Sequence, residues 1–150
     1  MTLPDAVVSL LAQPVAVEQP AQAFAFLTVD HQGFPHVALL SAVELAAGTD
    51  GTLHAVLAGT TTRANVLRTR QASLIAVEGE TIHTLKLEVR RATESEGVLG
   101  VVFVVCDHKA DSLGIALSPI GFRPTLEVAS LEQWDRAGRV LAGLGDAIAG

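Results

Sequence analysis

The chain has 150 residues, of which 49% are hydrophobic and 17% are charged, a composition that favours one well-packed domain over a disordered segment. Its formal net charge is −6, from 16 acidic and 10 basic residues, so it lacks the positive surface that binds a phosphate backbone. We therefore predict a single domain over residues 1–150 and no nucleic-acid partner.

Neither export nor a membrane span is indicated by the sequence. Cys106 is the single cysteine, so no internal disulfide can form, and no positively charged region precedes the first apolar residues. The longest apolar run, residues 98–106, is well short of the roughly 20 residues that a membrane-spanning helix needs. These features predict a soluble cytoplasmic protein with no membrane association.

The first half of the chain has the pattern of a short helix followed by a β-hairpin. A proline and an acidic residue near the N-terminus suit the first turn of a helix, which must end before Pro14. Residues 23–30 and 35–46 are rich in strand-forming residues, and the turn between them contains Gly33. Residues 52–58 form a third strand, and the short connection to it implies antiparallel pairing.

The second half begins with threonine-rich residues 59–62, which interrupt the strand pattern before a short helix over residues 63–70. Residues 72–78 and 81–91 are the next two strands. In the second of these, apolar and charged residues alternate, as expected for one buried and one exposed face. Residues 98–109 are apolar on both faces, which indicates a sixth strand that is either central in the sheet or covered by another subunit.

The C-terminal part has a weaker strand pattern near residues 121–127 and then a helical one. Ser130 and Gln133 have the spacing of a capping box, and apolar residues recur every three or four positions from Leu131 to Ile148. This spacing predicts one amphipathic helix. The order of elements predicts a mainly β fold, a barrel of antiparallel strands with short helices.

Residues 59–65 are the most informative segment for function. Threonine hydroxyls, the free N–H groups of a helix N-terminus and the guanidinium of Arg63 together make a good phosphate site. The alternative is that a threonine only caps the helix and Arg63 is a solvated surface residue.

Three segments resemble the FMN-binding split barrels of the pyridoxamine 5'-phosphate oxidase-like superfamily: AFLTVDHQGFPHVALL, LAGTTTRANVLRTRQASLIAV and HTLKLEVRRA. The resemblance implies a six-stranded antiparallel split barrel that holds FMN. It places Thr62 and Arg63 in the loop that holds the FMN phosphate, and the strand from His36 to Leu40 against the isoalloxazine. The residues implied in cofactor binding are His36, Val37, Ala38, Leu39, Leu40, Thr60, Thr61, Thr62, Arg63 and Asn65.

The sequence also departs from this family. Ala64 stands where the vitamin-oxidising members usually have a lysine, and the chain lacks their arginine-rich C-terminal segment, so pyridoxamine phosphate oxidase activity is not expected. The function expected is an FMN-dependent oxidoreductase with a small-molecule redox substrate and no assigned catalytic residue. The alternative is a non-catalytic binding module of the same fold that holds haem, a deazaflavin or no cofactor.

Two further expectations concern metals and assembly. The five histidines form no HExxH motif, and the chain has no second cysteine that could complete a zinc site with Cys106. No metal is therefore expected. Cys106 itself lies in an apolar strand, where a buried thiol is unreactive. The low charge content and the doubly apolar residues 98–106 predict a homodimer, because one exposed face of that strand would form a large apolar patch.

Overall fold

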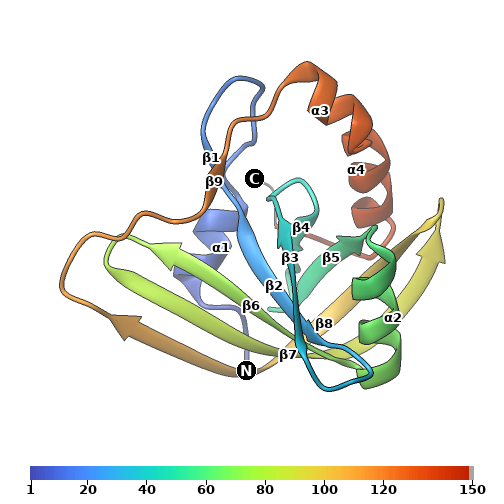
Figure 1. The fold of residues 1–150 in the computed structure, drawn as a ribbon, viewed down its shortest axis with the longest axis horizontal. Coiled ribbons are helices and arrows are strands. Elements are labelled where there is room, and N and C mark those ends of the chain that lie inside the picture. The colour runs from blue at the N-terminus through green and yellow to red at the C-terminus, as the bar shows by residue number, and fades with distance from the viewer. Residues whose placement is uncertain (149–150) are drawn as a thin grey trace.

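The computed structural model describes residues 1–148 and consists of one curled antiparallel sheet with helices around it (Figure 1). The strands of this sheet are β2 (Phe24–Val29), β3 (Pro35–Leu40), β4 (Leu45–Ala47), β5 (Leu53–Leu57), β6 (Gln71–Glu78), β7 (Thr81–Ser95) and β8 (Val98–Ser112). Their spatial order is β3-β2-β6-β7-β8-β5-β4. Two short strands, β1 (Ala21–Gln22) and β9 (Gly121–Phe122), pair separately. The helices are α1 (Asp5–Leu11), α2 (Thr60–Thr69), α3 (Leu126–Leu131) and α4 (Trp134–Ala142). The predicted mainly β, antiparallel fold is confirmed.

The main sheet has seven strands instead of the predicted six, because the expected strand over residues 35–46 is two strands. Ser41 N donates a hydrogen bond to Glu44 Oε2 at 2.8 Å, and Val43 N donates one to Ser41 Oγ at 3.2 Å. These side-chain acceptors hold a turn between β3 and β4, which then lie at opposite edges of the sheet. Apolar residues continue the strand pattern across the turn, so the pattern alone did not reveal it.

Two β-bulges bend the long pair formed by β7 and β8. Lys86 pairs with Asp107 and Leu87 with Val105, so Cys106 is an extra residue in β8. A second shift in register leaves Arg90 as an extra residue in β7. Bulges increase the local twist of a strand pair, which accounts for the curl of the sheet.

The main core lies on the inner face of the curled sheet. Phe26 and Phe103 meet there with ring centroids 5.8 Å apart, and both side chains are fully buried. Helix α1 contributes Val7 and Leu11 to this core, and α2 contributes Val66. No helix among residues 1–148 is both long and apolar enough to cross a membrane.

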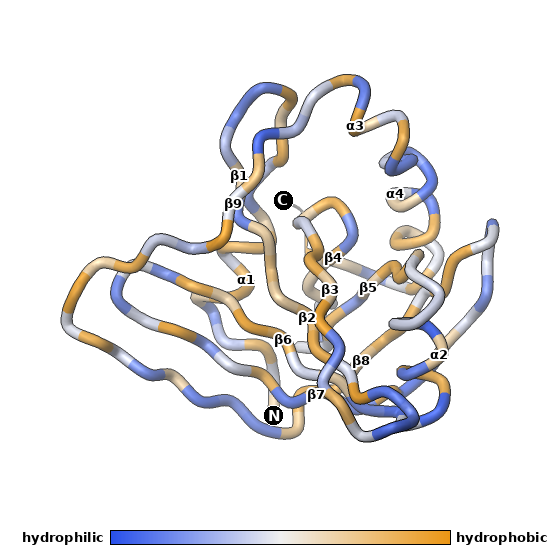
Figure 2. The backbone as a smooth tube through the Cα atoms, viewed as in Figure 1, coloured by the Kyte–Doolittle hydropathy of each residue, from blue (hydrophilic) through white to orange (hydrophobic). Residues whose placement is uncertain are grey.

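Helix α4 covers the outer face of β5 and the first part of β8. Val56, Val98, Ala137 and Val140 form a second buried cluster between them. A Cβ atom added to Gly100 would lie 3.0 Å from side-chain atoms of both Val140 and Leu144, so the helix approaches the strand closely at this point. The apolar outer face of β8 is therefore covered by the chain's own helix at its start, and the strand turns polar beyond Cys106 (Figure 2).

The single C-terminal helix predicted from Leu131 is wrong, since α3 and α4 are separate. Gln133 lies between them with φ 51°, in the left-handed region that interrupts a helix. Ser130 lies in the last turn of α3, whose N-cap is Thr125: its side chain accepts a hydrogen bond from Val128 N. The residues that α4 and its C-terminal extension bury are Ala137, Val140 and Leu144.

The close packing at Gly100 gives a testable prediction. Gly100→Val should destabilise the protein by about 1–3 kcal/mol, because the added methyl groups must displace Val140 or Leu144 from a packed cluster. Gly138→Ala, on α4 where a Cβ would meet nothing within 4 Å, should instead stabilise it by about 0.5–1 kcal/mol. Urea unfolding of the two variants measures both changes, and equal stabilities would contradict the proposed packing.

Candidate functional site

The chain leaves the sheet after β5 and begins α2 directly. Gly59 is the N-cap with an extended backbone, φ −65° and ψ 130°, and no side chain in the described part of the chain caps the helix. Thr60, Thr61 and Thr62 thus form the first turn, instead of a loop before a helix that starts at Arg63. Their N–H groups have no intrahelical acceptor, as is general for a first turn. Thr60 and Thr61 are exposed, and Thr62 is buried.

A pocket of about 160 Å³ lies beside this first turn. Its walls come from five parts of the chain: the end of β3, the turn between β3 and β4, the segment from β5 into α2, the start of β8, and the junction of α3 and α4 with the first turn of α4. The lining residues are Ala38, Leu39, Leu40, Glu44, Val56, Leu57, Ala58, Gly59, Thr62, Val98, Glu132, Gln133, Arg136 and Ala137. The structure therefore brings together four of the residues that the sequence assigned to a cofactor: Ala38, Leu39, Leu40 and Thr62.

The other assigned residues do not line this pocket. His36 and Val37 lie farther back along β3, where His36 pairs with Thr28 of β2. Asn65 is buried, and its Nδ2 donates a hydrogen bond to Thr28 Oγ1 at 3.0 Å. Its Oδ1 accepts one from Arg68 at 3.2 Å, so both ends of this amide are used within the protein.

Arg63 points to the turn between β7 and β8, beside the pocket. Its Nη1 donates a hydrogen bond to the carbonyl of Gly97 at 3.1 Å, and its Nη2 is 3.9 Å from Glu94 Oε1. Arginine has five N–H donors in a planar fork, so these contacts leave donors available for an anion. The side chain is 24% exposed, which keeps it accessible from solvent.

Glu44 and Arg136 line the pocket but were not foreseen from the sequence. Burial raises the pKa of the Glu44 carboxyl, against the hydrogen bond that it accepts from Ser41 N, and nearby Glu132 raises it further. Arg136 donates from Nη1 to the carbonyl of Glu96 at 3.2 Å. Both residues reach the pocket only through tertiary packing, so no local sequence signal could have identified them.

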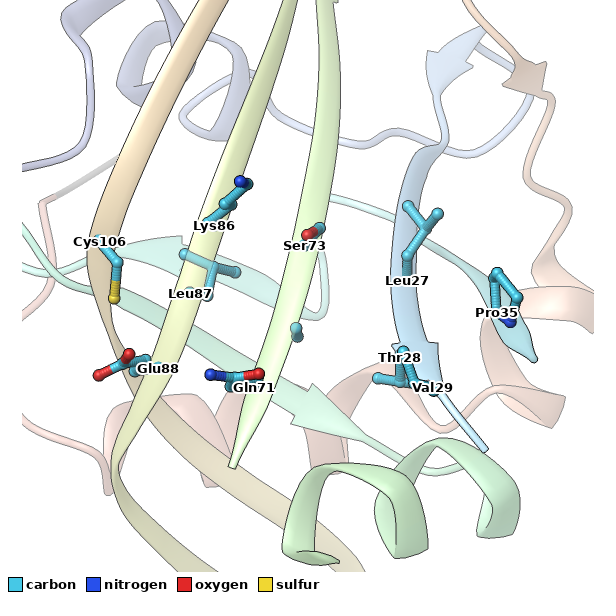
Figure 3. Close-up of a pocket in the computed structure, with 11 residues that line it drawn as sticks. Leu27, Thr28, Val29, Pro35, Gln71, Ser73, Lys86, Leu87, Glu88 and Cys106 are labelled. Atoms are coloured by element: carbon cyan, nitrogen blue, oxygen red, sulfur yellow. The ribbon is translucent and has the colours of Figure 1, made fainter. Parts of the chain in front are cut away.

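A second, wider groove of about 400 Å³ crosses the outer face of β2, β6, β7 and β8. Figure 3 shows Leu27, Val29 and Pro35 on one side and Lys86, Glu88 and Cys106 on the other, with Gln71 and Ser73 between them. Cys106 is exposed there, contrary to the buried position expected for it. Desolvation and Glu88 raise the pKa of its thiol, so the reactive thiolate is disfavoured.

The fold is known from solved structures, although no protein-family model matches the sequence and no curated protein does. An F420 reductase aligns over 67% of this chain and 94% of its own, with 12% identity and a TM-score of 0.52. The styrene monooxygenase flavin reductase of Pseudomonas putida aligns over 69% of this chain and 87% of its own, with 7% identity and a TM-score of 0.52. The HupZ protein of Group A Streptococcus aligns over 73% of this chain and 99% of its own, with 14% identity and a TM-score of 0.56.

The chain has the split-barrel fold. The resemblance seen in the sequence is thus confirmed at the level of the fold. At sequence identities of 7–14%, similarity to these structures shows the fold and says nothing of the chemistry. The cofactor and the reaction of this split barrel must be argued from its own residues. Within residues 1–148, no three His, Cys, Asp or Glu side chains converge as metal ligands.

Glu44 provides a prediction about pH. A carboxyl with a raised pKa costs stability when it ionises in the folded state, so this cost is absent below its unfolded pKa and grows as the pH rises above it. Glu44→Gln removes the charge and keeps an oxygen that can accept from Ser41 N. The variant should be more stable than the wild type at about pH 7 and equal to it at about pH 4. Urea unfolding at both pH values tests this, and the same difference at both would refute it.

Proposed function

We propose that this split barrel binds FMN and works as an oxidoreductase on a small-molecule redox substrate, as a homodimer. The observation that carries the proposal is the meeting of the first turn of α2 with the edge strand β3 at one pocket. The flavin reductases among the similar structures support a flavin as the cofactor. Bound FMN would supply hydride or electron transfer, and the protein would bind it, orient it and exclude water.

The first turn of α2 fits a phosphate. Three N–H groups without helical acceptors, the exposed hydroxyls of Thr60 and Thr61, and the fork of Arg63 are all hydrogen-bond donors. A Cβ atom added to Gly59 would meet only Thr62 Oγ1, at 3.9 Å, so this N-cap is open to a ligand. The donors available here match an anion with several acceptor oxygens.

Strand β3 fits a flat ring. It lies at one edge of the sheet, so among residues 1–148 one of its sides has no strand partner, and Ala38, Leu39 and Leu40 give it an apolar surface at the pocket. The pocket, at about 160 Å³, is below the roughly 300–1,000 Å³ usual for ligand sites. One chain would therefore enclose only part of FMN, and a second chain would cover the rest.

A deazaflavin is the second candidate cofactor, because one of the similar structures is an F420 reductase. The acidic chain, with a net charge of −6, disfavours its long anionic tail. Titrating the purified protein with FMN and with F420, and measuring the fluorescence of each cofactor, compares the two candidates directly.

Arg63→Ala should weaken FMN binding by about 1.5–3 kcal/mol, the range for a hydrogen bond to a charged group, which is roughly a ten- to hundredfold loss. The affinity is measured by quenching of flavin fluorescence. Riboflavin, which lacks the phosphate, is the control, and its affinity should hardly change. If the substitution weakens both flavins equally, or neither, Arg63 does not bind the phosphate.

The outer groove is the surface that we propose for the dimer. It combines apolar Leu27, Val29 and Pro35 with the opposite charges of Lys86 and Glu88 (Figure 3). Within residues 1–148 neither of these charges is in an ion pair. In a two-fold interface the same patch meets itself, so Lys86 of one protomer can lie opposite Glu88 of its partner.

Sedimentation should therefore show a dimer of the 15.6 kDa chain at micromolar concentration. Lys86→Glu should weaken the dimer, because it places like charges opposite each other across the interface. Adding Glu88→Lys to that variant restores opposite charges and should restore the dimer. A wild-type monomer, or a double variant as weak as the single one, would show that this face is not the interface.

A further inference from the structure

We propose that Arg136, on α4, is a second phosphate-binding residue of the candidate site and acts together with Arg63. The inference rests on the proposed function, since it concerns the phosphate of the ligand in the same pocket. It assigns a role to a residue that the sequence motif around Arg63 does not include.

The two arginines, from α2 and α4, bind carbonyls of the same turn. Arg63 Nη1 donates to the carbonyl of Gly97 at 3.1 Å, and Arg136 Nη1 donates to the carbonyl of Glu96 at 3.2 Å. These acceptors are consecutive residues of the β7–β8 turn, so one turn binds a guanidinium group from each of the two helices. A Cβ atom added to Gly97 would lie 3.8 Å from Arg136 Nη1, so this guanidinium group also lies close to Gly97, whose carbonyl Arg63 binds.

Neither charge is strongly compensated. Each arginine donates one hydrogen bond to a neutral carbonyl. The Glu94 side chain is 69% exposed, and its Oε1 lies 3.9 Å from Arg63 Nη2. The carboxylate of Glu96 is taken by Arg139, whose Nη2 donates to it at 2.8 Å. Within residues 1–148, Arg136 makes no ion pair. One such cation in the pocket wall, Arg136, and one beside the pocket, Arg63, favour a ligand with about two negative charges, which a phosphate monoester carries near neutral pH.

Arg136 also provides a second positive charge, which the first turn of α2 lacks. Ala64, next to Arg63 on α2, is exposed and uncharged, so the first turn of that helix offers a single cation. Arg136 lines the pocket together with Thr62 and Gly59, next to the free N–H groups of α2. Helix α4 can therefore provide the second fork for the phosphate oxygens.

Two carboxyl groups in the pocket wall oppose an anion. Glu44 accepts a hydrogen bond from Ser41 N, and burial favours its neutral form by raising its pKa. Glu132 is exposed, so water screens its charge. The phosphate should accordingly bind at the end of the pocket next to the β7–β8 turn, where both arginines lie.

The test compares FMN and riboflavin binding to Arg136→Gln, measured by fluorescence quenching. We expect a loss of FMN affinity of about ten- to hundredfold and almost no change for riboflavin. Arg136→Lys keeps the charge but loses the fork, so its loss should be smaller. Arg139→Gln is the matched control, since it removes the same charge from the same helix and releases the same turn, and its FMN affinity should be nearly that of the wild type.

Urea unfolding shows whether each variant is folded. The inference is overturned if Arg136→Gln binds FMN as tightly as the wild type does. It is also overturned if the substitution weakens FMN and riboflavin binding equally. In both cases the proposal that the protein binds FMN still stands. An equal loss in Arg139→Gln also overturns the inference, because the effect would then come from the position of the turn.

Failure of the proposed function is distinguishable from failure of this inference. If the wild type binds neither flavin, calorimetric titration with inorganic pyrophosphate tests the arginine pair without any flavin. Pyrophosphate binding that is lost in Arg136→Gln and kept in Arg139→Gln supports the pair. No pyrophosphate binding by the wild type overturns it.

Discussion

The close contact between α4 and β8 at Gly100 is the constraint on which the candidate pocket depends. A glycine at this position lets Val140 and Leu144 pack directly on the strand, and this contact fixes the axis of the helix. The residues one turn earlier on α4, Arg136 and Ala137, then form a wall of the pocket. A packing feature outside the site therefore determines the geometry within it.

The β7–β8 turn connects the elements around the pocket by electrostatics. Arg63 from α2 and Arg136 from α4 bind its carbonyls, and Arg139 binds the carboxylate of Glu96 through two nitrogens. The Arg139 pair lowers the pKa of the Glu96 carboxyl, so this carboxylate stays charged at neutral pH. Individual surface ion pairs contribute little stability, whereas the two arginine–carbonyl hydrogen bonds connect α2 and α4 to the same turn.

Much of the fold follows from local patterns, because alternation and turn residues act over a few positions. Strands over 72–78 and 81–91 were expected nearly where β6 and β7 lie. The turn at Ser41 and Glu44 and the break at Gln133 were missed, since each depends on a hydrogen bond or a backbone angle that composition does not encode. Of the site, the motif around Thr62 was visible in the sequence. Glu44 and Arg136 were not, because only tertiary packing brings them to it.

The bulge at Cys106 shifts the alternation of inward- and outward-facing residues in β8 by one position. Before it, odd-numbered residues such as Val105 face the core. After it, the even-numbered His108 shares the inner face with Leu85, and its Nε2 lies 2.9 Å from His83 Nδ1. Any alignment that reads β8 as one uninterrupted strand will assign every residue beyond Cys106 to the wrong side of the sheet. Asp107, which pairs with Lys86, belongs to the outer surface for the same reason. Deleting Cys106 would remove the bulge and leave a regular alternation, with Val105 still facing the core and Asp107 still on the outer surface.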